Sequence, residues 1–593
     1  MISALNIAKN GKQWLPTLLP FALIAAPAVI EALYISRYAV DVPFWDEWVF
    51  VPLLQTSRQS GNWLLHLWAP LNEHRMVFPR LLFLVLSSIS GWNVIVEMYF
   101  SLFLACLLLL GLGLIYKEVC HGSLWGFVPI AWLVFSLGQY ENILYGMQMA
   151  FYLNVLAMLW TFYFLSVRPR RMIGWAMLSG IVASFSLNSG LLVWPVGLLY
   201  LIIVQVGKRQ LATWGLVGLL VIVAYYTGYD FPPNHSSPLL VLSQPIVATA
   251  FLIANVGSPL GGTNLGFSLV MGAYLMALLL LFAYKKLPIL RHGIWRQDPS
   301  AVLVNLVLMS VLSSIAITIG RVGLGFEAAL SSRYTTITSM GIIGIYMLFA
   351  QDHLSGFKLD GRLHCASVIL CTLFPVIVIG LIMANAHGID LGAKIYETRL
   401  RMKYVLQTFD IQSDDALKTL YLPGSVRGRA PYLQQEKLSV FREPVGTLLP
   451  PSYEEGMPVG DILPHHAVVQ AFRCPVPTLK DISVLLATYN RHNTSSFQIS
   501  LIDNNTILVQ QSFLAAEIKD NSWLHLMLPT PVENCAGQDL VLRIKSRDAS
   551  PGNAITIWTY PRYYDGKLLK PADPSFSDRV IGLELNTRGV LGW

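Results

Sequence analysis

The sequence has few charged residues for its length, and this scarcity excludes most classes of protein. Only 13% of the 593 residues are charged and 54% are hydrophobic, whereas about 25% of an ordinary soluble protein is charged. Residues 1–384 hold 33 of the 75 charged residues, and the remaining 209 residues hold 42. The sequence therefore predicts a membrane body followed by a soluble tail. It excludes a cytosolic enzyme, a disordered chain and a fibrous repeat, and nucleic acid is not an expected partner despite the net charge of +7.

Motifs for nucleotide and metal binding are also missing. No Walker A loop is present, and no GxGxxG follows an expected strand. No grouping of His, Cys and Asp in the expected outer segments has the spacing of metal ligands. We therefore expect no nucleotide as energy source and no certain cofactor, and a divalent metal is not implied.

Long apolar runs dominate the first two thirds of the chain. A membrane-spanning helix needs about 20 predominantly apolar residues, and eleven runs approach that length. A further run, Leu239 to Val256, would break the charge pattern of the loops, so we interpret it as re-entrant or surface-lying. The eleven runs are Trp14 to Leu33, Trp92 to Tyr116, Leu124 to Leu137, Met149 to Val167, Met172 to Leu187, Leu191 to Val206, Trp214 to Tyr229, Phe267 to Tyr284, Ala301 to Ile319, Thr335 to Phe349 and Cys365 to Ala384.

The basic residues between these runs predict the orientation. Cytoplasmic loops carry an excess of Lys and Arg. With the N-terminus in the cytoplasm, fourteen of the twenty basic residues before Asn385 lie in inner loops. Eleven crossings then place the C-terminal tail outside. The six basic residues of the outer loops are Arg37, Arg58, Arg75, Arg80, Arg321 and Arg333.

The first outer loop, residues 35–91, is much longer than most others. Its segments Trp48 to Leu54, Trp63 to Trp68 and Arg75 to Ile89 mix aromatic, aliphatic and polar residues. They are too short or too interrupted to span, and Trp favours the membrane interface. We expect short helices at the membrane surface. Long loops are usually functional unless they are disordered.

The tail divides into two parts. Residues 385–466 begin with a helical pattern, which continues to Phe441, and end in a Pro/Gly-rich linker at Pro444 to Gly460. Residues 467–593 contain seven short alternating runs separated by turn signals, which is typical of a β-sandwich. The expected strands are Val468 to Arg473, Ile482 to Tyr489, Phe497 to Ile502, Ile507 to Phe513, Trp523 to Leu528, Leu540 to Ile544 and Ile555 to Tyr560.

The densest polar cluster of the first loop is acidic. Asp46 and Glu47 lie between Trp45 and Trp48, and Asn72-Glu73-His74-Arg75 follows. Ionisable groups at the membrane are costly and usually functional, although Asp46 and Glu47 could also begin a helix as N-terminal caps. Glu73 and His74 fit two interpretations equally: a role at the site, or a hydrogen-bonded pair that joins the two halves of the loop.

A second, basic cluster lies between the ninth and tenth runs. Arg321 is flanked by glycines, and Ser332-Arg333-Tyr334 follows. Arginine binds phosphate oxygens with two parallel hydrogen bonds and stays charged, so these residues suit an anionic headgroup. The alternative is that each arginine pairs with an acidic neighbour or reaches lipid phosphate.

Other polar residues are weaker candidates. Glu141 lies in a short polar outer loop that could recognise sugar hydroxyls or simply end a span. Glu31 and Glu97 lie within or at the edge of runs, and we interpret them as buried partners of the external arginines. Cys474 and Cys535 fall near the ends of different strands of the outer domain. They form either a disulfide, which an oxidising compartment permits, or two buried thiols.

With these features the sequence resembles the GT-C superfamily of integral-membrane glycosyltransferases, which use polyprenyl-phosphate sugars as donors. The matching features are the many spans, the long first outer loop with the acidic motif Asp46-Glu47, and the C-terminal outer domain. The stretch from Gly320-Arg321 to Ser332-Arg333-Tyr334 looks like a segment of bacterial members. The resemblance covers residues 1–384. It implies that Asp46 is the general base and that the chain lies in a bacterial inner membrane, with its C-terminal domain in the periplasm.

The residue chemistry agrees with that implication. An acceptor hydroxyl needs a base, whereas a lipid phosphate leaves without an acid. We expect inverting transfer of a sugar to a glycan or glycolipid acceptor, with Asp46 as base, Arg333, Arg321 and Tyr334 at the donor phosphate, and Glu47 as the second candidate catalytic residue. Glu73, His74, Arg75 and Glu141 would support the substrate or the loop. The rival is a transporter or flippase of lipid-linked sugar, for which paired, interrupted helices are typical.

Overall fold

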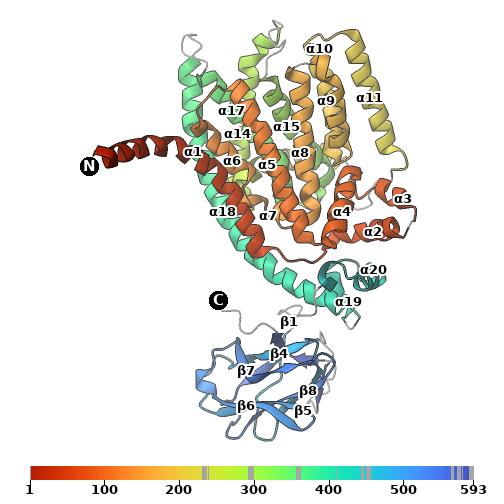
Figure 1. Cartoon of the computed structure of the whole chain (residues 1–593), viewed down its shortest axis with the longest axis vertical. Coiled ribbons are helices and arrows are strands. Elements are labelled where there is room, and N and C mark those ends of the chain that lie inside the picture. The colour runs from red at the N-terminus through yellow and green to blue at the C-terminus, as the bar shows by residue number, and fades with distance from the viewer. Residues whose placement is uncertain are drawn as a thin grey trace. The chain divides into compact units, whose positions relative to one another are not determined.

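The computed structural model describes residues 2–586 except 60, 168, 230–236, 238, 292–299, 355–361, 411, 443–446, 449–455, 562–565, 570–575 and 577–578. The chain is mostly helical, and its C-terminal region consists of antiparallel sheets (Figure 1). It divides into two compact units, and each unit is described by itself. The helical unit contains Met1–Ala39, Pro52–Ser90 and Val94–Ile395. The tail unit contains Val40–Val51, Gly91–Asn93 and Tyr396–Trp593.

Helices occupy the chain as far as Arg442, and several are joined by 3-10 turns (η). In chain order they are α1 (Ile2–Tyr38), η1 (Trp45–Val49), α2 (Phe50–Arg58), α3 (Trp63–Trp68), α4 (Val77–Ser90), α5 (Val94–Val119), η2 (Leu124–Phe127), α6 (Val128–Val134), η3 (Leu137–Gln139), α7 (Tyr140–Ile143), η4 (Gly146–Gln148), α8 (Met149–Val167), α9 (Pro169–Ser184), η5 (Asn188–Leu192), α10 (Val193–Ile203), α11 (Lys208–Tyr226), α12 (Leu240–Ser243), α13 (Pro245–Gly261), α14 (Leu265–Arg291), α15 (Ala301–Arg321), η6 (Val322–Leu324), α16 (Phe326–Ala329), η7 (Ser332–Tyr334), α17 (Thr335–Leu354), α18 (Arg362–Gln407), α19 (Asp414–Lys418), α20 (Pro423–Gln435) and η8 (Ser439–Arg442).

Within the described residues, seven helices are long and apolar enough to cross a membrane, fewer than the eleven expected. Each overlaps one of the expected runs. The seven are Leu18–Tyr38, Val94–Val119, Gly146–Val167, Lys208–Tyr226, Leu265–Tyr284, Ala301–Leu324 and Cys371–Gln407.

The other four runs are not among these seven helices, and three of the four cross breaks in the backbone. The run at 124–137 forms η2 and the seven-residue α6, and the run at 172–187 lies in the 16-residue α9. The run at 191–206 belongs to the shorter apolar helix Asn188–Ile203. The fourth run lies in α17, which has 20 residues but begins with the polar Thr335 and Thr336. By helix length and composition, the described residues therefore show fewer clear spans than the eleven expected.

The helices of the helical unit pack side by side. Figure 1 shows α5, α8 and α9 as neighbours, with α15 beside α8. The hairpin of α13 and α14 packs backbone against backbone: a Cβ at Gly257 would lie 1.9 Å from the carbonyl oxygen of Ser268, and one at Gly272 would lie 1.8 Å from that of Ile253. Small residues permit such close approach between helices in membranes.

The first loop contains short helices, as its pattern predicts. They are α2, α3 and α4, and η1 precedes them. The loop does not belong to one unit, however, because residues 40–51 pack with the tail and residues 52–90 with the helical unit. Gly91 to Asn93, just before α5, also belong to the tail unit.

The tail begins inside a helix. α18 runs without interruption through 46 residues and contains Pro375, so the chain has no break at the expected boundary after Ala384. The compact units divide at Ile395 and Tyr396 instead. The helical pattern predicted between Asp390 and Phe441 corresponds to the end of α18 followed by α19, α20 and η8.

Two antiparallel sheets follow the helices. The first has the order β1-β12-β4-β9-β11, with β2 on β9 and β7 on β4, and the second has the order β10-β3-β8-β5-β6. The bounds are β1 (Thr447–Leu448), β2 (Met457–Pro458), β3 (Val468–Arg473), β4 (Thr478–Ala487), β5 (Ser496–Asp503), β6 (Thr506–Leu514), β7 (Ser522–Glu533), β8 (Asp539–Ser546), β9 (Thr556–Pro561), β10 (Gly566–Leu569), β11 (Arg579–Ile581) and β12 (Leu583–Asn586), with the 3-10 turn η9 (Ala515–Glu517) after β6.

All seven expected strands are present, as β3 to β9. In β8 every second side chain is buried, which is the pattern of a strand with one face in a core. Apolar residues of both sheets, among them Ile482 of β4 and Leu542 of β8, share one core. The expected linker at 444–460 is in part sheet, since β1 pairs with β12 and β2 with β9. Residues 444–446 and 449–455 of that linker lie outside the described residues.

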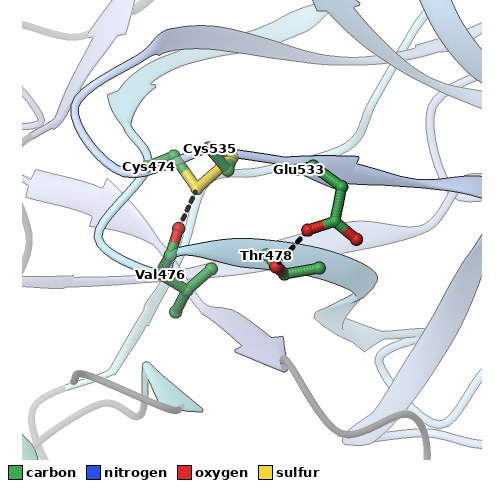
Figure 2. Close-up of a disulfide and its surroundings, with 5 residues drawn as sticks. All are labelled: Cys474, Val476, Thr478, Glu533 and Cys535. Atoms are coloured by element: carbon green, nitrogen blue, oxygen red, sulfur yellow. Dashed lines mark hydrogen bonds between the residues drawn. A yellow bond between two sulfur atoms is a disulfide. The ribbon is translucent and has the colours of Figure 1, made fainter.

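Cys474 and Cys535 form a disulfide (Figure 2). Their Cα atoms are 5.7 Å apart, and 61 residues separate them in sequence. Beside them, the hydroxyl of Thr478 donates to a carboxylate oxygen of Glu533 at 2.7 Å. In the chain-entropy model a loop of this length stabilises the folded state by on the order of 4 kcal/mol.

Candidate functional site

The acidic segment of the first loop begins with a strained turn. Trp45, the first residue of η1, has a φ of +47°, which bulky L residues rarely adopt. Its backbone N–H donates to the carbonyl of Leu420 at 2.9 Å, and its indole is 56% exposed. Strained backbone persists where surrounding structure holds it, often at functional sites.

The two adjacent carboxylates of this turn have different surroundings. Glu47 is fully buried, and its Oε2 accepts a hydrogen bond from the backbone N–H of Phe44 at 2.9 Å. The N–H of Glu47 donates to the carbonyl of Phe44 at 3.1 Å. Asp46 is only half-buried. Glu47 therefore closes the turn as a cap, whereas the side chain of Asp46 reaches the surface of the tail unit.

Residues of the tail hold this segment from several sides. Arg442 forms an ion pair of 2.6 Å with Asp41, and the guanidinium of Arg399 lies 3.6 Å from the ring centroid of Phe44. Arg429 donates from Nη1 to the carbonyl of Trp48 at 2.6 Å. Sequence reasoning missed these arginines because they lie more than 350 residues further along the chain, and no local pattern connects them with the first loop.

In the helical unit, Glu73 and Arg321 form a close ion pair. Arg321 Nη2 lies 2.6 Å from Glu73 Oε1, and both side chains are mostly buried. Burial alone would raise the pKa of Glu73, but the neighbouring His74 and Arg321 and the hydrogen bonds of the carboxylate outweigh it and lower that pKa to about 2. Glu73 is therefore ionised at any physiological pH and neutralises Arg321.

His74 and Arg75 connect the same turn to other helices. His74 Nδ1 accepts a hydrogen bond from the N–H of Asn188 at 3.1 Å, which leaves the ring proton on Nε2, 3.6 Å from Glu73 Oε1. Arg75 is buried and donates to the carbonyls of Trp68, Tyr225 and Thr227. The interpretation of these residues as loop support fits this geometry.

A second cluster joins Glu141 to the loop that carries Arg333. Glu141 Oε2 accepts hydrogen bonds from the hydroxyls of Ser331 and Ser332 at 3.0 and 2.8 Å and from the N–H of Arg333 at 3.0 Å. In addition, Asn142 Nδ2 donates to the carbonyl of Arg333 at 3.0 Å. The backbone around Arg333 is therefore fixed from α7.

The side chain of Arg333 is less constrained than its backbone. Nε donates to the hydroxyl of Ser331 at 2.8 Å, and the side chain is 45% exposed. Nη2 lies 3.8 Å from Glu141 Oε1, which is too long for a hydrogen bond. The terminal nitrogens of Arg333 thus have no hydrogen-bond partner among the described residues. An oriented, exposed guanidinium of this kind can bind an oxyanion.

Tyr334 interacts with both Arg321 and Arg333, and the Cζ of Arg333 lies 6.0 Å from the centroid of the tyrosine ring. Its side chain is half-buried, and its hydroxyl hydrogen-bonds to the Arg321 guanidinium. Burial raises the pKa of Tyr334, and the charges of Arg333 and Arg321 oppose that shift. The hypothesis that Glu31 and Glu97 pair with the external arginines was wrong for Arg321 and Arg333, whose carboxylate partners are Glu73 and Glu141.

The candidate residues fall into three groups. Glu73, His74 and Arg321 lie together, and so do Glu141 and Arg333; both groups belong to the helical unit. Asp46 and Glu47 belong to the tail unit. Across the part of the chain that the structure describes, no group of three or more His, Cys, Asp or Glu could hold a metal ion. Comparison with protein-family models and with curated proteins found no match.

Proposed function

We propose that this chain is an inverting glycosyltransferase of the GT-C type in a bacterial inner membrane. It transfers a sugar from a polyprenyl-phosphate donor to a glycan or glycolipid acceptor on the outer side. In this proposal the N-terminus is cytoplasmic, and the two sheets of the tail form a periplasmic β-sandwich that serves as an accessory module.

The proposal rests on one observation: the backbone of Arg333 is fixed while its guanidinium is exposed. Its backbone is held by Glu141 and Asn142, and Ser331 orients its Nε. Its side chain remains 45% exposed. A guanidinium arranged in this way offers two parallel hydrogen-bond donors to a phosphate. The phosphodiester of a lipid-linked sugar has two non-bridging oxygens that can accept them. Arg321, which Glu73 neutralises, contributes less to the binding of an anion.

The difference between Asp46 and Glu47 supports the choice of base. Glu47 is buried and accepts the N–H of Phe44, whereas Asp46 reaches the surface. In the proposed step the acceptor oxygen attacks the anomeric carbon and its proton moves to the Asp46 carboxylate. The bond from the anomeric carbon to the phosphate oxygen breaks, and polyprenyl phosphate leaves with the electron pair. A single displacement inverts the anomeric configuration.

A second candidate function is transport of a lipid-linked sugar without chemistry. One observation favours it: Glu31 lies in the membrane-length helix Leu18–Tyr38, is 1% exposed, and neither of its oxygens has a hydrogen-bond partner among the described residues. Ionisable residues inside membranes often mark transport pathways.

Reconstitution of the purified chain in liposomes tests both functions. Polyprenyl-phosphate sugars that carry different hexoses and pentoses are supplied with glycolipid and oligosaccharide acceptors, and products are detected by mass spectrometry. We expect one donor to yield a product of inverted configuration, and Asp46→Asn to abolish it. Movement of an intact donor between leaflets, without any product and without an effect of Asp46→Asn, would replace the transferase with the transporter.

A further inference from the structure

The surroundings of Asp46 in the tail unit contain groups that the proposed reaction does not yet use. The segment 420–429, which ends within α20, contacts the acidic turn at two points. Trp45 N–H donates to the carbonyl of Leu420 at 2.9 Å, and Arg429 Nη1 donates to the carbonyl of Trp48 at 2.6 Å. The side chains that flank Asp46 are therefore drawn from the tail as well as from the first loop.

Arg429 differs from its neighbour Arg427 on the same helix. Arg427 uses all three nitrogens, with Asp414 and the carbonyls of Phe409 and Gln412 as acceptors. Arg429 is half-buried, and its bond to Trp48 is its one hydrogen bond to the described residues, none of which provides a carboxylate within 4.0 Å. Its guanidinium is anchored at one nitrogen and retains donors for another oxyanion.

Tyr421 and Trp45 complete the group. Tyr421 is half-buried and directly follows Leu420. Burial raises its pKa, the nearby charge of Asp46 raises it further and that of Arg429 opposes the shift, so the phenol lies near both charges. The exposed indole of Trp45 is the kind of flat apolar surface on which a sugar ring packs.

We propose that Tyr421 and Arg429 form the acceptor subsite beside Asp46, and that the acceptor is a saccharide whose reacting hydroxyl lies near an oxyanion. The oxyanion is a phosphate or a carboxylate, since both accept hydrogen bonds from a guanidinium. Tyr421 hydrogen-bonds the sugar, and Trp45 packs against its ring. This inference rests on the proposed function for the role of Asp46, but the binding of an anionic saccharide can be measured without transfer.

The experiment uses the full chain in nanodiscs with three matched probes: octyl glucoside, octyl glucoside 6-phosphate and octyl glucuronide. Each is titrated as a ligand by calorimetry and offered as an acceptor. We expect at least one anionic probe to bind at least tenfold more tightly than octyl glucoside. Comparison of the phosphate probe with the glucuronide probe then shows whether the subsite prefers a phosphate or a carboxylate.

Variants test the residues. Arg429→Ala should weaken the anionic probe at least tenfold and raise its KM without changing the KM of the donor, while Arg429→Lys, which keeps the charge, retains part of the preference. Tyr421→Phe should weaken all three probes. Arg427→Ala is the matched control on the same helix: it should lower thermal stability but preserve the preference for the anionic probe.

The outcomes separate this inference from the proposed function. Equal binding of neutral and anionic probes, or an anionic preference that survives in both Arg429 variants, overturns the subsite. A preference that depends on Arg429 in a protein that transfers no sugar from any donor supports the subsite and rejects the transferase. Transfer to a neutral acceptor with a KM that Arg429→Ala does not change supports the transferase and overturns the subsite.

Discussion

The acidic turn of the first loop and the segment from Arg321, at the end of α15, to Tyr334, before α17, each contain two like charges, and the two regions are built differently. In the first, Asp46 and Glu47 are adjacent, and only Glu47 is buried. In the second, Arg321 and Arg333 are twelve residues apart, and Arg321 has its carboxylate partner at 2.6 Å while that of Arg333 is at 3.8 Å. The comparison teaches that like charges close in sequence need not share a role. In each region one charge maintains the fold, and the other faces the surroundings.

The largest effect is expected from substitutions that separate the roles of Asp46 and Glu47 in the acidic turn. Asp46→Asn should reduce transfer by about a hundredfold to ten-thousandfold, because a positioned base contributes that much, while expression and membrane insertion remain normal. Glu47→Gln should mainly lower the melting temperature, since it weakens the hydrogen bond to the Phe44 N–H. Its effect on the rate of the folded fraction should be smaller. Initial rates per folded molecule and thermal melts check both. A turnover in Asp46→Asn equal to wild type would reverse the assignment.

The next effect concerns Glu73 and stability against pH. Its pKa is lowered from 4.5 to about 2, so the ionised carboxylate contributes on the order of 3 kcal/mol to folding at neutral pH. A lowered folded-state pKa means that this contribution is complete above about pH 4.5 and disappears as the pH falls towards 2. Glu73→Gln should therefore be clearly less stable than wild type at pH 7, with the two melting curves converging in acid. A gap that stays constant with pH would exclude the ion pair as its origin.

A smaller effect is expected at Arg333. Arg333→Lys keeps the charge but replaces an oriented fork with a point charge, so the KM for a polyprenyl-phosphate donor should rise by about tenfold. Arg321→Lys should change that KM less, because its guanidinium already binds Glu73. Donor titrations at saturating acceptor give both values. The assignment of Arg333 fails if the two variants show the reverse order.

The smallest effect sharpens the contrast between the two arginines. Because Arg333 is 45% exposed and its ion pair is long, Arg333→Ala should change stability by less than ~1 kcal/mol, as for other surface pairs. Arg321→Ala leaves Glu73 buried without its closest cation and should cost considerably more. Thermal melts in one detergent compare the two. Equal losses would show that Arg333 is structural as well.

Local patterns predicted much of the fold. The strands β3 to β9 lie in short runs separated by turn signals, and the short helices of the first loop have clear apolar patches, so both were predicted. Strands that depend on distant partners were missed. β1 and β2 have two residues each; β1 pairs with β12, which also pairs with β4, and β2 pairs with β9. Hydropathy also counted apolar runs whose helices are short, because composition does not report where a backbone breaks.

The candidate site was predicted less completely, for the same reason. Residue type identified Asp46, Glu73, Arg321 and Arg333 as chemically capable groups. It did not distinguish the cap Glu47 from Asp46, since that depends on a hydrogen bond to Phe44 and on burial. Arg429 and Arg442 had no signal, because their contacts with the first loop join residues about four hundred positions apart.

The disulfide has a practical consequence for mapping the tail by proteolysis. It encloses β4, β5, β6 and β7, together with the turns at residues 488–495 and 503–505. A protease that cuts at either turn yields two fragments that remain covalently joined. On a non-reducing gel such a nicked chain migrates as one species, and addition of dithiothreitol releases two. The gel pair therefore reports nicks within the 61-residue loop separately from cuts elsewhere in the chain.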